Sequence, residues 1–121
     1  MAKTILVIDD STSLRQVVKI ALTGAGYNVI EAGDGQAALA LLDGRQVHMA
    51  VCDVNMPIMN GIEFVKATKK LPSYKFMPIL MLTTESQEAR KEEGRAAGAK
   101  AWMVKPFSPS QLVSAVGKLC V

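Results

Sequence analysis

The 121-residue sequence predicts one α/β domain in which a parallel sheet is covered by helices on both faces. Two observations predict this fold class. Short apolar runs, such as TILVI at 4–8, alternate along the chain with segments of helical periodicity. Each run also ends at a polar residue or a turn, as buried parallel strands do. The chain is long enough for one hydrophobic core, so we expect a single domain over residues 1–121.

Five strands and five helices are expected in strict alternation. The expected strands cover residues 4–8, 28–31, 48–52, 78–82 and 101–104. The expected helices cover residues 12–24, 35–43, 62–70, 86–97 and 109–119. Because right-handed crossovers join the strands of such units, neighbouring strands should be parallel.

Two of the helices carry informative local signals. Ser108, Pro109 and Gln111 form the pattern of a capping box with proline at the first helical position, which predicts the start of the last helix. The helix expected at 86–97 has alanines as its only apolar contacts and contains Gly94. We therefore expect this helix to open more easily than the others.

Composition excludes several classes of function. No apolar stretch approaches the roughly 20 residues that span a membrane, and the first residues lack a signal-peptide pattern, so a cytoplasmic protein without a membrane partner is expected. A net charge of +3 without a basic recognition element argues against direct nucleic-acid binding. Cys52 and Cys120 are expected to be reduced thiols, and His48 with Cys52 would supply too few ligands for structural zinc.

Polar side chains stand where four of the expected strands end. These residues are Asp9 and Asp10, Asp53, Thr83, and Lys105. The carboxyl ends of parallel strands share one edge of the sheet, and ligands of open α/β sheets bind outside that edge. We therefore expect the five side chains to meet, although they are scattered over the sequence.

Three carboxylates at one edge would repel one another unless a cation neutralises them. Oxygen ligands alone favour Mg²⁺ or Mn²⁺ over zinc. The hydroxyl of Thr83 and the ammonium of Lys105 suit the oxygens of a phosphoryl group. Asp53, on a central strand, is the best candidate for a nucleophile that forms an acyl phosphate, with Asp9 and Asp10 holding the metal. Helix capping would explain one of these acids but not three.

These motifs resemble a response-regulator receiver domain of the CheY type that stands alone. The resemblance rests on the Asp9–Asp10 pair, DVNMPIMNG at 53–61, Thr83, and KPF at 105–107, and it covers essentially the whole chain. It implies a flavodoxin-like (βα)5 fold with strand order 2-1-3-4-5. It also implies a signalling phospho-acceptor of a two-component system, which catalyses only its own phosphotransfer and autodephosphorylation and is not otherwise an enzyme.

The resemblance assigns a role to each acidic residue. Asp53 would accept a phosphoryl group from the phosphohistidine of a histidine kinase. Asp10, Asp53 and the backbone carbonyl of Asn55 would bind Mg²⁺ directly, while Asp9 would assist through water.

The resemblance also implies a switch. Lys105 would contact the phosphoryl group, Thr83 would turn toward it, and the peptide bond from Lys105 to Pro106 would be cis. Trp102 matches the switch aromatic, which in the family is normally Tyr or Phe; the larger indole puts free inward rotation in doubt. Thr84 stands where alanine is common, and its size is expected to hinder the approach of water or a phosphodonor. Asn55 and Glu85 occupy positions that tune dephosphorylation in the family.

The implied partners are a CheA-like histidine kinase, an output protein such as the flagellar motor switch, and a phosphatase. A phosphorelay shuttle or a stand-alone regulator of a non-chemotaxis pathway would use the same site. A flavodoxin-like electron carrier would need a phosphate-binding loop where DDSTS at 9–13 places two carboxylates. An aspartyl-phosphate phosphatase of the haloacid dehalogenase type would carry its nucleophile after the first strand, in a DxD pattern.

Overall fold

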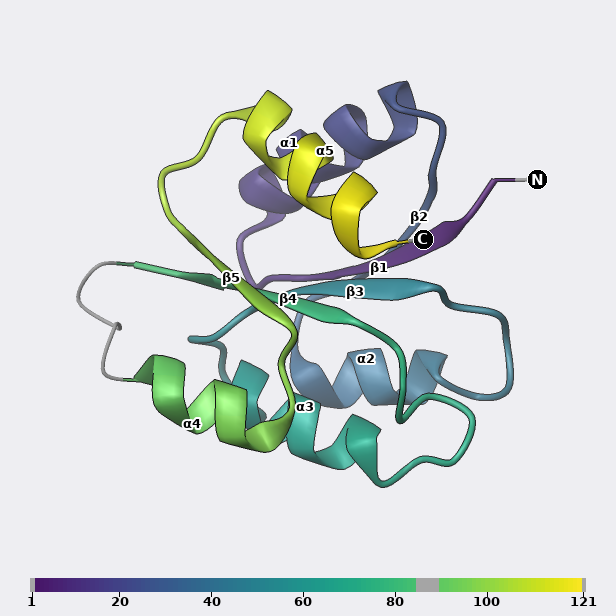
Figure 1. The fold of residues 1–121 in the computed structure, drawn as a ribbon, viewed down its shortest axis with the longest axis vertical. Helices are drawn as coiled ribbons and strands as arrows, with labels where there is room; N and C mark the ends of the chain where they lie inside the picture. Colours follow the sequence, from purple (N-terminus) through teal and green to yellow (C-terminus); the bar gives the residue numbers. More distant parts are fainter. Residues whose placement is uncertain (1, 85–89, 121) are drawn as a thin grey trace.

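The computed structural model describes residues 2–84 and 90–120, which form a five-stranded parallel sheet between two layers of helices (Figure 1). The strand order is β2-β1-β3-β4-β5. The strands are β1 (Thr4–Ile8), β2 (Asn28–Ala32), β3 (Met49–Asp53), β4 (Ile79–Thr83) and β5 (Ala101–Val104). The helices are α1 (Thr12–Gly24), α2 (Gly35–Leu41), α3 (Gly61–Lys69), α4 (Lys91–Ala97) and α5 (Pro109–Leu119).

The predicted fold class and strand order are confirmed, with small differences at the ends of elements. β3 and β4 each begin and end one residue later than expected, so Asp53 and Thr83 are the last residues of their strands. α2 ends at Leu41, two residues early. Residues 86–89 of the expected fourth helix lie outside the described residues, and α4 is described from Lys91.

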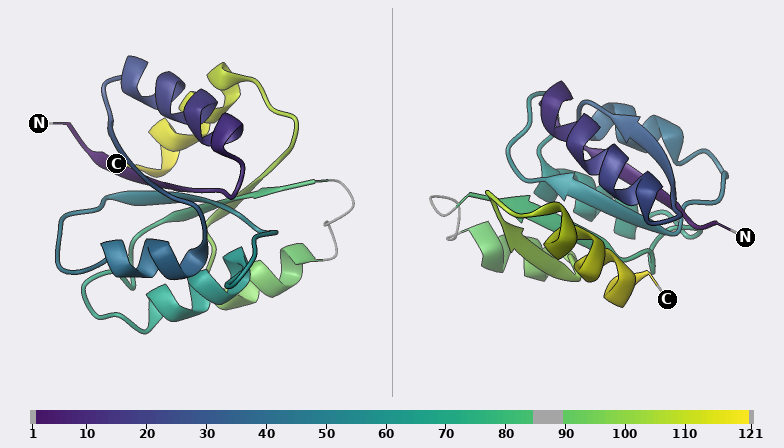
Figure 2. Two further views of the ribbon diagram at one scale, coloured as in Figure 1. Left: turned by 180° about the vertical axis from the view of Figure 1, so that it is seen from behind. Right: turned by 90° about the horizontal axis from the view of Figure 1, so that it is seen from above.

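Alternating side chains of the strands build two cores, one on each face of the sheet. Ile5 and Val7 of β1 pack with α1 and α5, whereas Leu6 and Ile8 pack toward α2 and α3. Figure 2 shows α1 and α5 together on one face of the sheet. Burying one such aliphatic side chain contributes about 1.5–3 kcal/mol. Because both faces are covered, the central strands are apolar along their length and turn polar where they end.

Side-chain caps fix where four of the helices begin. Ser108 accepts a hydrogen bond from the backbone of Gln111, whose side chain bonds back to Ser108, and Pro109 is the first helical residue, as predicted. Asn60 and Glu63 form a second capping box at α3. Such a cap is worth about 1 kcal/mol. The remaining side-chain caps are Ser11 at α1 and Asp34 at α2.

The two edges of the sheet are different in character. The carboxyl ends of the strands carry the connections from β1 to α1 and from β3 to α3, while the two chain ends lie at the opposite, amino edge (Figures 1 and 2). No helix in the described part of the chain is long and apolar enough to cross a membrane.

Gly94 of α4 has a packing role that its low helix propensity did not reveal. A Cβ atom at this position would collide with the indole carbons Cη2 and Cζ2 of Trp102 on β5. The missing side chain therefore lets the indole, which is partly buried against the core, lie directly on the α4 backbone.

This contact predicts that Gly94→Ala changes the free energy of unfolding in opposite directions in the wild type and in a Trp102→Ala background. In the wild type, Gly94→Ala should lower the free energy of unfolding by about 1–3 kcal/mol, because the new methyl group overpacks the indole. In a Trp102→Ala background, the same substitution should raise it by up to about 1 kcal/mol, because alanine favours the helix. Urea unfolding of the four proteins measures both values.

Gly117→Ala on α5 is the matched control. Its Cβ would lie 4.0 Å from the Tyr27 hydroxyl, with nothing closer, so this substitution should stabilise both backgrounds. A stabilising Gly94→Ala in the wild type would contradict the described contact.

Candidate functional site

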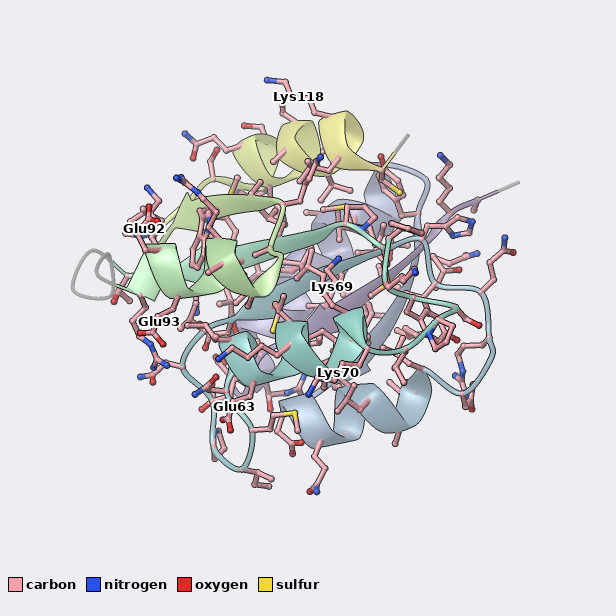
Figure 3. The ribbon with its side chains drawn as sticks, turned by 60° about the horizontal axis from the view of Figure 1, so that its bottom comes forward. Glu63, Lys69, Lys70, Glu92, Glu93 and Lys118 are labelled. Atoms are coloured by element: carbon pink, nitrogen blue, oxygen red, sulfur yellow. The ribbon has the colours of Figure 1, made fainter. Side chains whose placement is uncertain are left out.

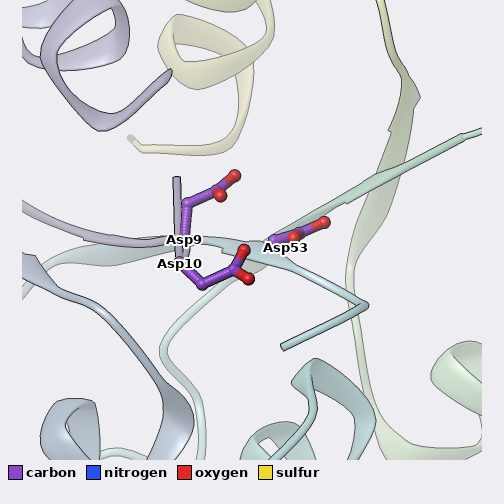
Figure 4. A group of neighbouring side chains, drawn as sticks. All are labelled: Asp9, Asp10 and Asp53. Carbon is purple, nitrogen blue, oxygen red and sulfur yellow. The ribbon is translucent and has the colours of Figure 1, made fainter. Parts of the chain in front are cut away.

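The five polar residues predicted to converge lie together at the carboxyl edge of the sheet. The oxygens of Asp9, Asp10 and Asp53 that could serve as ligands all lie within 4.8 Å of one another. Figure 4 shows the three carboxylates pointing to the same side from the ends of β1 and β3. The ammonium of Lys105 joins this group from the end of β5.

Lys105 bridges the two buried carboxylates. Its Nζ donates to Asp9 Oδ2 at 3.2 Å and to Asp53 Oδ1 at 3.1 Å. The side chains of Asp9 and Asp53 are only 2% and 8% exposed, so water does little to stabilise their charge. A buried carboxylate without a counterion is costly, and Lys105 supplies that counterion. The sequence predicted that Lys105 would lie near the site but not that it would contact both acids.

The surroundings of Asp53 favour the protonated form of its carboxyl group. Burial raises the pKa of Asp53 and the nearby charge of Asp9 raises it further, against the lowering effects of Lys105 and of a hydrogen bond to the Asn55 backbone. Burial alone would lower the pKa of Lys105, but Asp53 and Asp9 outweigh burial and raise it. A second cation at this edge would favour the ionised form of Asp53.

The three acids differ in accessibility. Asp9 is turned inward, where its Oδ1 also accepts from the backbone N of Ser11 at 2.9 Å. Asp10 is exposed, and the cap of α1 is Ser11 rather than Asp10, so no capping bond occupies the Asp10 carboxylate. The group therefore combines buried charge with an open side, as a site for a partly hydrated cation requires.

Thr83 and Lys105 are held next to each other by the pairing of β4 with β5. Thr83 is 2% exposed, and its carbonyl accepts a hydrogen bond from the backbone N of Lys105 at 2.6 Å. The Lys105–Pro106 peptide bond is cis, as predicted. Thr84 is exposed, and Glu85 lies outside the described residues.

Two residues that support the site were not identified from the sequence. Arg15 of α1 donates to the backbone carbonyl of Asp9 at 2.6 Å and so fixes the turn that carries the acidic pair. Gly61, the first residue of α3, lies so close to the carbonyl of Asp53 that a Cβ atom would collide with it. In the sequence, the only local indication that the backbone at 61 approaches Asp53 closely is the glycine directly after the capping residue Asn60.

Among the described residues, His48 and Cys52 belong to no group of side chains that could hold a metal ion. His48 Nδ1 accepts a hydrogen bond from the backbone N of Thr4 at 2.9 Å. Cys52 is fully buried; burial, followed by the charges of Asp53 and Asp9, raises the pKa of its thiol well above the usual range. Both cysteines are free thiols, as predicted.

The raised pKa of Asp53 predicts how stability depends on pH in the metal-free protein. The pKa of Asp53 in the folded protein exceeds the unfolded value of about 3.9. Protonated Asp53 therefore contributes stability at pH values below the unfolded pKa, and this stability is lost as the pH rises through the folded pKa. Asp53→Asn should therefore be more stable than the wild type at pH 7. The difference should shrink as the pH falls and disappear below the unfolded pKa of about 3.9.

Urea unfolding in EDTA across this pH range measures the effect. Asp43→Asn, which alters an exposed acid paired with Arg45, is the control and should show no gain at neutral pH. A pH-independent difference for Asp53→Asn would contradict the electrostatic origin of the effect.

Comparison with known proteins agrees with the site and fold. Residues 5–117 match the model of the response regulator receiver domain. The chain is 41% identical over 110 residues to a chemotaxis protein CheY homolog of Campylobacter jejuni, covering 89% of this chain and 85% of that protein. It is 36% identical over 114 residues to the phosphate regulon transcriptional regulatory protein PhoB of Pseudomonas aeruginosa, covering 94% of this chain but 50% of that protein.

A solved structure gives the same result. The chemotaxis response regulator CheY4 of Vibrio cholerae superposes with a TM-score of 0.93 and 46% sequence identity, covering 98% of this chain and 99% of that one. The family model matches nearly the whole chain, and the acidic group lies at the carboxyl edge of a sheet with the order 2-1-3-4-5. The chain therefore belongs to the response regulator receiver domain family.

Proposed function

We propose that residues 1–121 act as a receiver that accepts a phosphoryl group on Asp53 and signals through phosphorylation-dependent protein contacts. The observation that carries the proposal is the contact of one ammonium with two buried carboxylates at an edge that also holds a third, exposed carboxylate. A receiver domain is a phospho-acceptor in signalling rather than an enzyme with a turnover substrate, and a histidine kinase is its partner.

The acidic group suits Mg²⁺ as the cofactor. Asp10, Asp53 and the backbone carbonyl of Asn55 would bind the ion, and Asp9 would act through water. Carboxylate oxygens of the three acids lie within 4.8 Å of one another, and one of these acids is open to solvent. Such donors favour Mg²⁺ or Mn²⁺ over softer metals. When bound, the ion would neutralise carboxylate charge and help to orient the phosphoryl oxygens.

Transfer would proceed by nucleophilic attack at phosphorus. A carboxylate oxygen of Asp53 attacks the phosphorus of a phosphohistidine, the P–N bond breaks, and its electron pair stays on the departing imidazole. The product is an acyl phosphate on Asp53. The Nζ of Lys105 lies 3.1 Å from Asp53 Oδ1. It is therefore placed to donate hydrogen bonds to the phosphoryl oxygens once they are attached to Asp53. Asp53 must be ionised to attack, and Lys105 lowers its pKa in that direction.

The signal would pass through β4 and β5. Thr83 would turn its hydroxyl toward the phosphoryl group, and movement of Thr83 and Lys105 together would shift the equilibrium between two conformations. Trp102 lies on β5, three residues before Lys105, and its indole rests on Gly94. In this chain a rearrangement of Trp102 would therefore be coupled to α4, whose N-cap residue, Arg90, makes no side-chain capping bond.

Chemotaxis is the pathway that the relatives favour. The relatives matched over most of their own length are named as chemotaxis CheY proteins, whereas the transcriptional regulators PhoB and PhoP are matched over about half of theirs. A CheA-like kinase and a flagellar motor switch protein are the partners that this pathway would supply, with a phosphatase to end the signal. A phosphorelay shuttle would share the site and differ in its partner.

The proposed phosphorylation has a direct test. Incubation with acetyl phosphate and Mg²⁺ should add one phosphoryl group, detected by intact mass, and the adduct should be labile to hydroxylamine as an acyl phosphate is. Asp53→Asn should abolish the adduct, and EDTA should prevent it. Lys105→Met should reduce its rate by at least tenfold, because the ammonium no longer stabilises the transferring group.

Asp43→Asn is again the matched control and should be phosphorylated like the wild type. An adduct that survives in Asp53→Asn, or that maps to another residue, would refute the assignment of Asp53.

A further inference from the structure

A second pocket lies at the edge of the sheet opposite the acidic site. It has a volume of about 480 Å³, within the range of small-molecule sites. Its lining comes from residues that precede the strands or follow the helices, including His48 before β3, Lys75 and Phe76 before β4, and Lys100 before β5. Lys69, the last residue of α3, completes one wall.

The pocket is strongly cationic. Lys69, Lys75 and Lys100 all line it, and no acidic residue of the described chain does. None of the three forms an ion pair within the described residues. Figure 3 shows Lys69 at the end of α3, whereas the acidic residues Glu63, Glu92 and Glu93 lie near the starts of α3 and α4. Three like charges thus line one hollow, and no carboxylate among residues 2–84 and 90–120 pairs with them.

Lys69 is held in place rather than free in solvent. Its carbon chain lies against Gly98, where an added Cβ would be 3.0 Å from Cε, and its Nζ donates to the Met77 carbonyl at 3.0 Å. An ammonium has three donors, so two remain available. Burial lowers the pKa of Lys69, and the charge of Lys100 lowers it further. A bound anion would oppose this lowering, because a nearby negative charge favours the charged ammonium.

Helix ends explain part of this charge but not all of it. The carboxyl end of a helix carries about half a negative charge and favours a lysine there, which accounts for Lys69. Lys75 and Lys100 lie in connections outside the helices, where this explanation does not apply. His48 adds a further donor: its Nδ1 accepts from Thr4, so the proton of the neutral ring is on Nε2.

An aromatic ring stands at the pocket beside the charges. The side chain of Phe76 is 86% exposed, and the Nζ of Lys75 lies 5.1 Å from its ring centre. Among the large hydrophobic residues of the described chain, Phe76 is the most exposed, so its ring is open to a stacking contact. Its position beside the ammoniums favours a ligand that combines several negative charges with a planar group.

We propose that this pocket binds a polyphosphate group, either as the free anion or as the phosphate chain of a nucleotide. Lysine binds phosphate as a point charge, and several phosphate charges are needed to match three ammoniums. Phe76 would contribute only if a nucleotide base accompanies the phosphates. The site is independent of Asp53, since it is built from the opposite edge of the sheet.

Calorimetric titration of the full chain with inorganic triphosphate tests the proposal. The buffer contains EDTA, so that the carboxylates at the other edge repel the anion and only the cationic pocket contributes. We expect saturable binding at a single site that weakens as salt is added. Lys75→Gln and Lys100→Gln should each weaken binding by about tenfold or more, because each removes a charge-assisted bond.

Lys66→Gln is the matched control, since Lys66 is an exposed lysine of α3 outside the pocket, and it should bind like the wild type. Unfolding midpoints of all variants establish that they are folded. The proposal is overturned if no saturable binding occurs near 0.1 M salt, or if Lys75→Gln and Lys100→Gln bind like the wild type. It is also overturned if a hexaglutamate peptide binds as tightly as triphosphate, which would assign the pocket to an acidic protein segment.

A second arm distinguishes the two sources of phosphate. Equal affinities for triphosphate and ATP, unaffected by Phe76→Ala, support recognition of the free anion. Tighter binding of ATP that is lost in Phe76→Ala supports recognition of a nucleotide.

Discussion

The contact between the Lys105 ammonium and two buried carboxylates is the interaction on which the carboxyl edge of this sheet depends. Asp9 directly follows β1 and Asp53 ends the neighbouring strand β3, and neither carboxylate is exposed enough for water to offset its charge. Taking one such ion out of water costs several kcal/mol unless a partner compensates it. Lys105 reaches both acids only because β5 ends beside β4, with its backbone N bonded to the Thr83 carbonyl. The strand order therefore places Lys105 beside both acids, and its charge offsets the free-energy cost of burying them.

This arrangement also gives the proposed switch a physical basis. One ammonium contacts two carboxylates, and burial, followed by the charge of Asp9, keeps the pKa of Asp53 raised despite Lys105. A metal ion or a phosphoryl group at this edge would change which anionic group the Lys105 ammonium binds most strongly. Any displacement of Lys105 is carried by β5, and the same strand holds Trp102 against Gly94 of α4. A local change of charge is thus connected to a helix on the surface through one strand and one indole.

The sequence was sufficient to predict the framework, because the framework follows from short-range patterns. Apolar runs of fixed length predicted the strands, the Ser108 capping box predicted the start of α5, and polar strand ends predicted the site. Contacts between distant segments were beyond such patterns. Gly94 reads as a poor helix former until Trp102 is placed on it, and nothing local distinguishes buried Asp9 from exposed Asp10. The cationic pocket was missed for the same reason, since its lysines come from the end of α3 and from the connections before β4 and β5.

Amide hydrogen exchange with and without Mg²⁺ and beryllofluoride is the most direct measure of whether charge at Asp53 reaches α4. Exchange in peptides covering α4 and β5 should change when both are added, while exchange in α2, which lacks a route through Lys105, should not. Asp53→Asn should abolish the change. If exchange changes only around the carboxylates and stays the same across residues 91–104, the coupling from Lys105 through Trp102 to α4 does not exist.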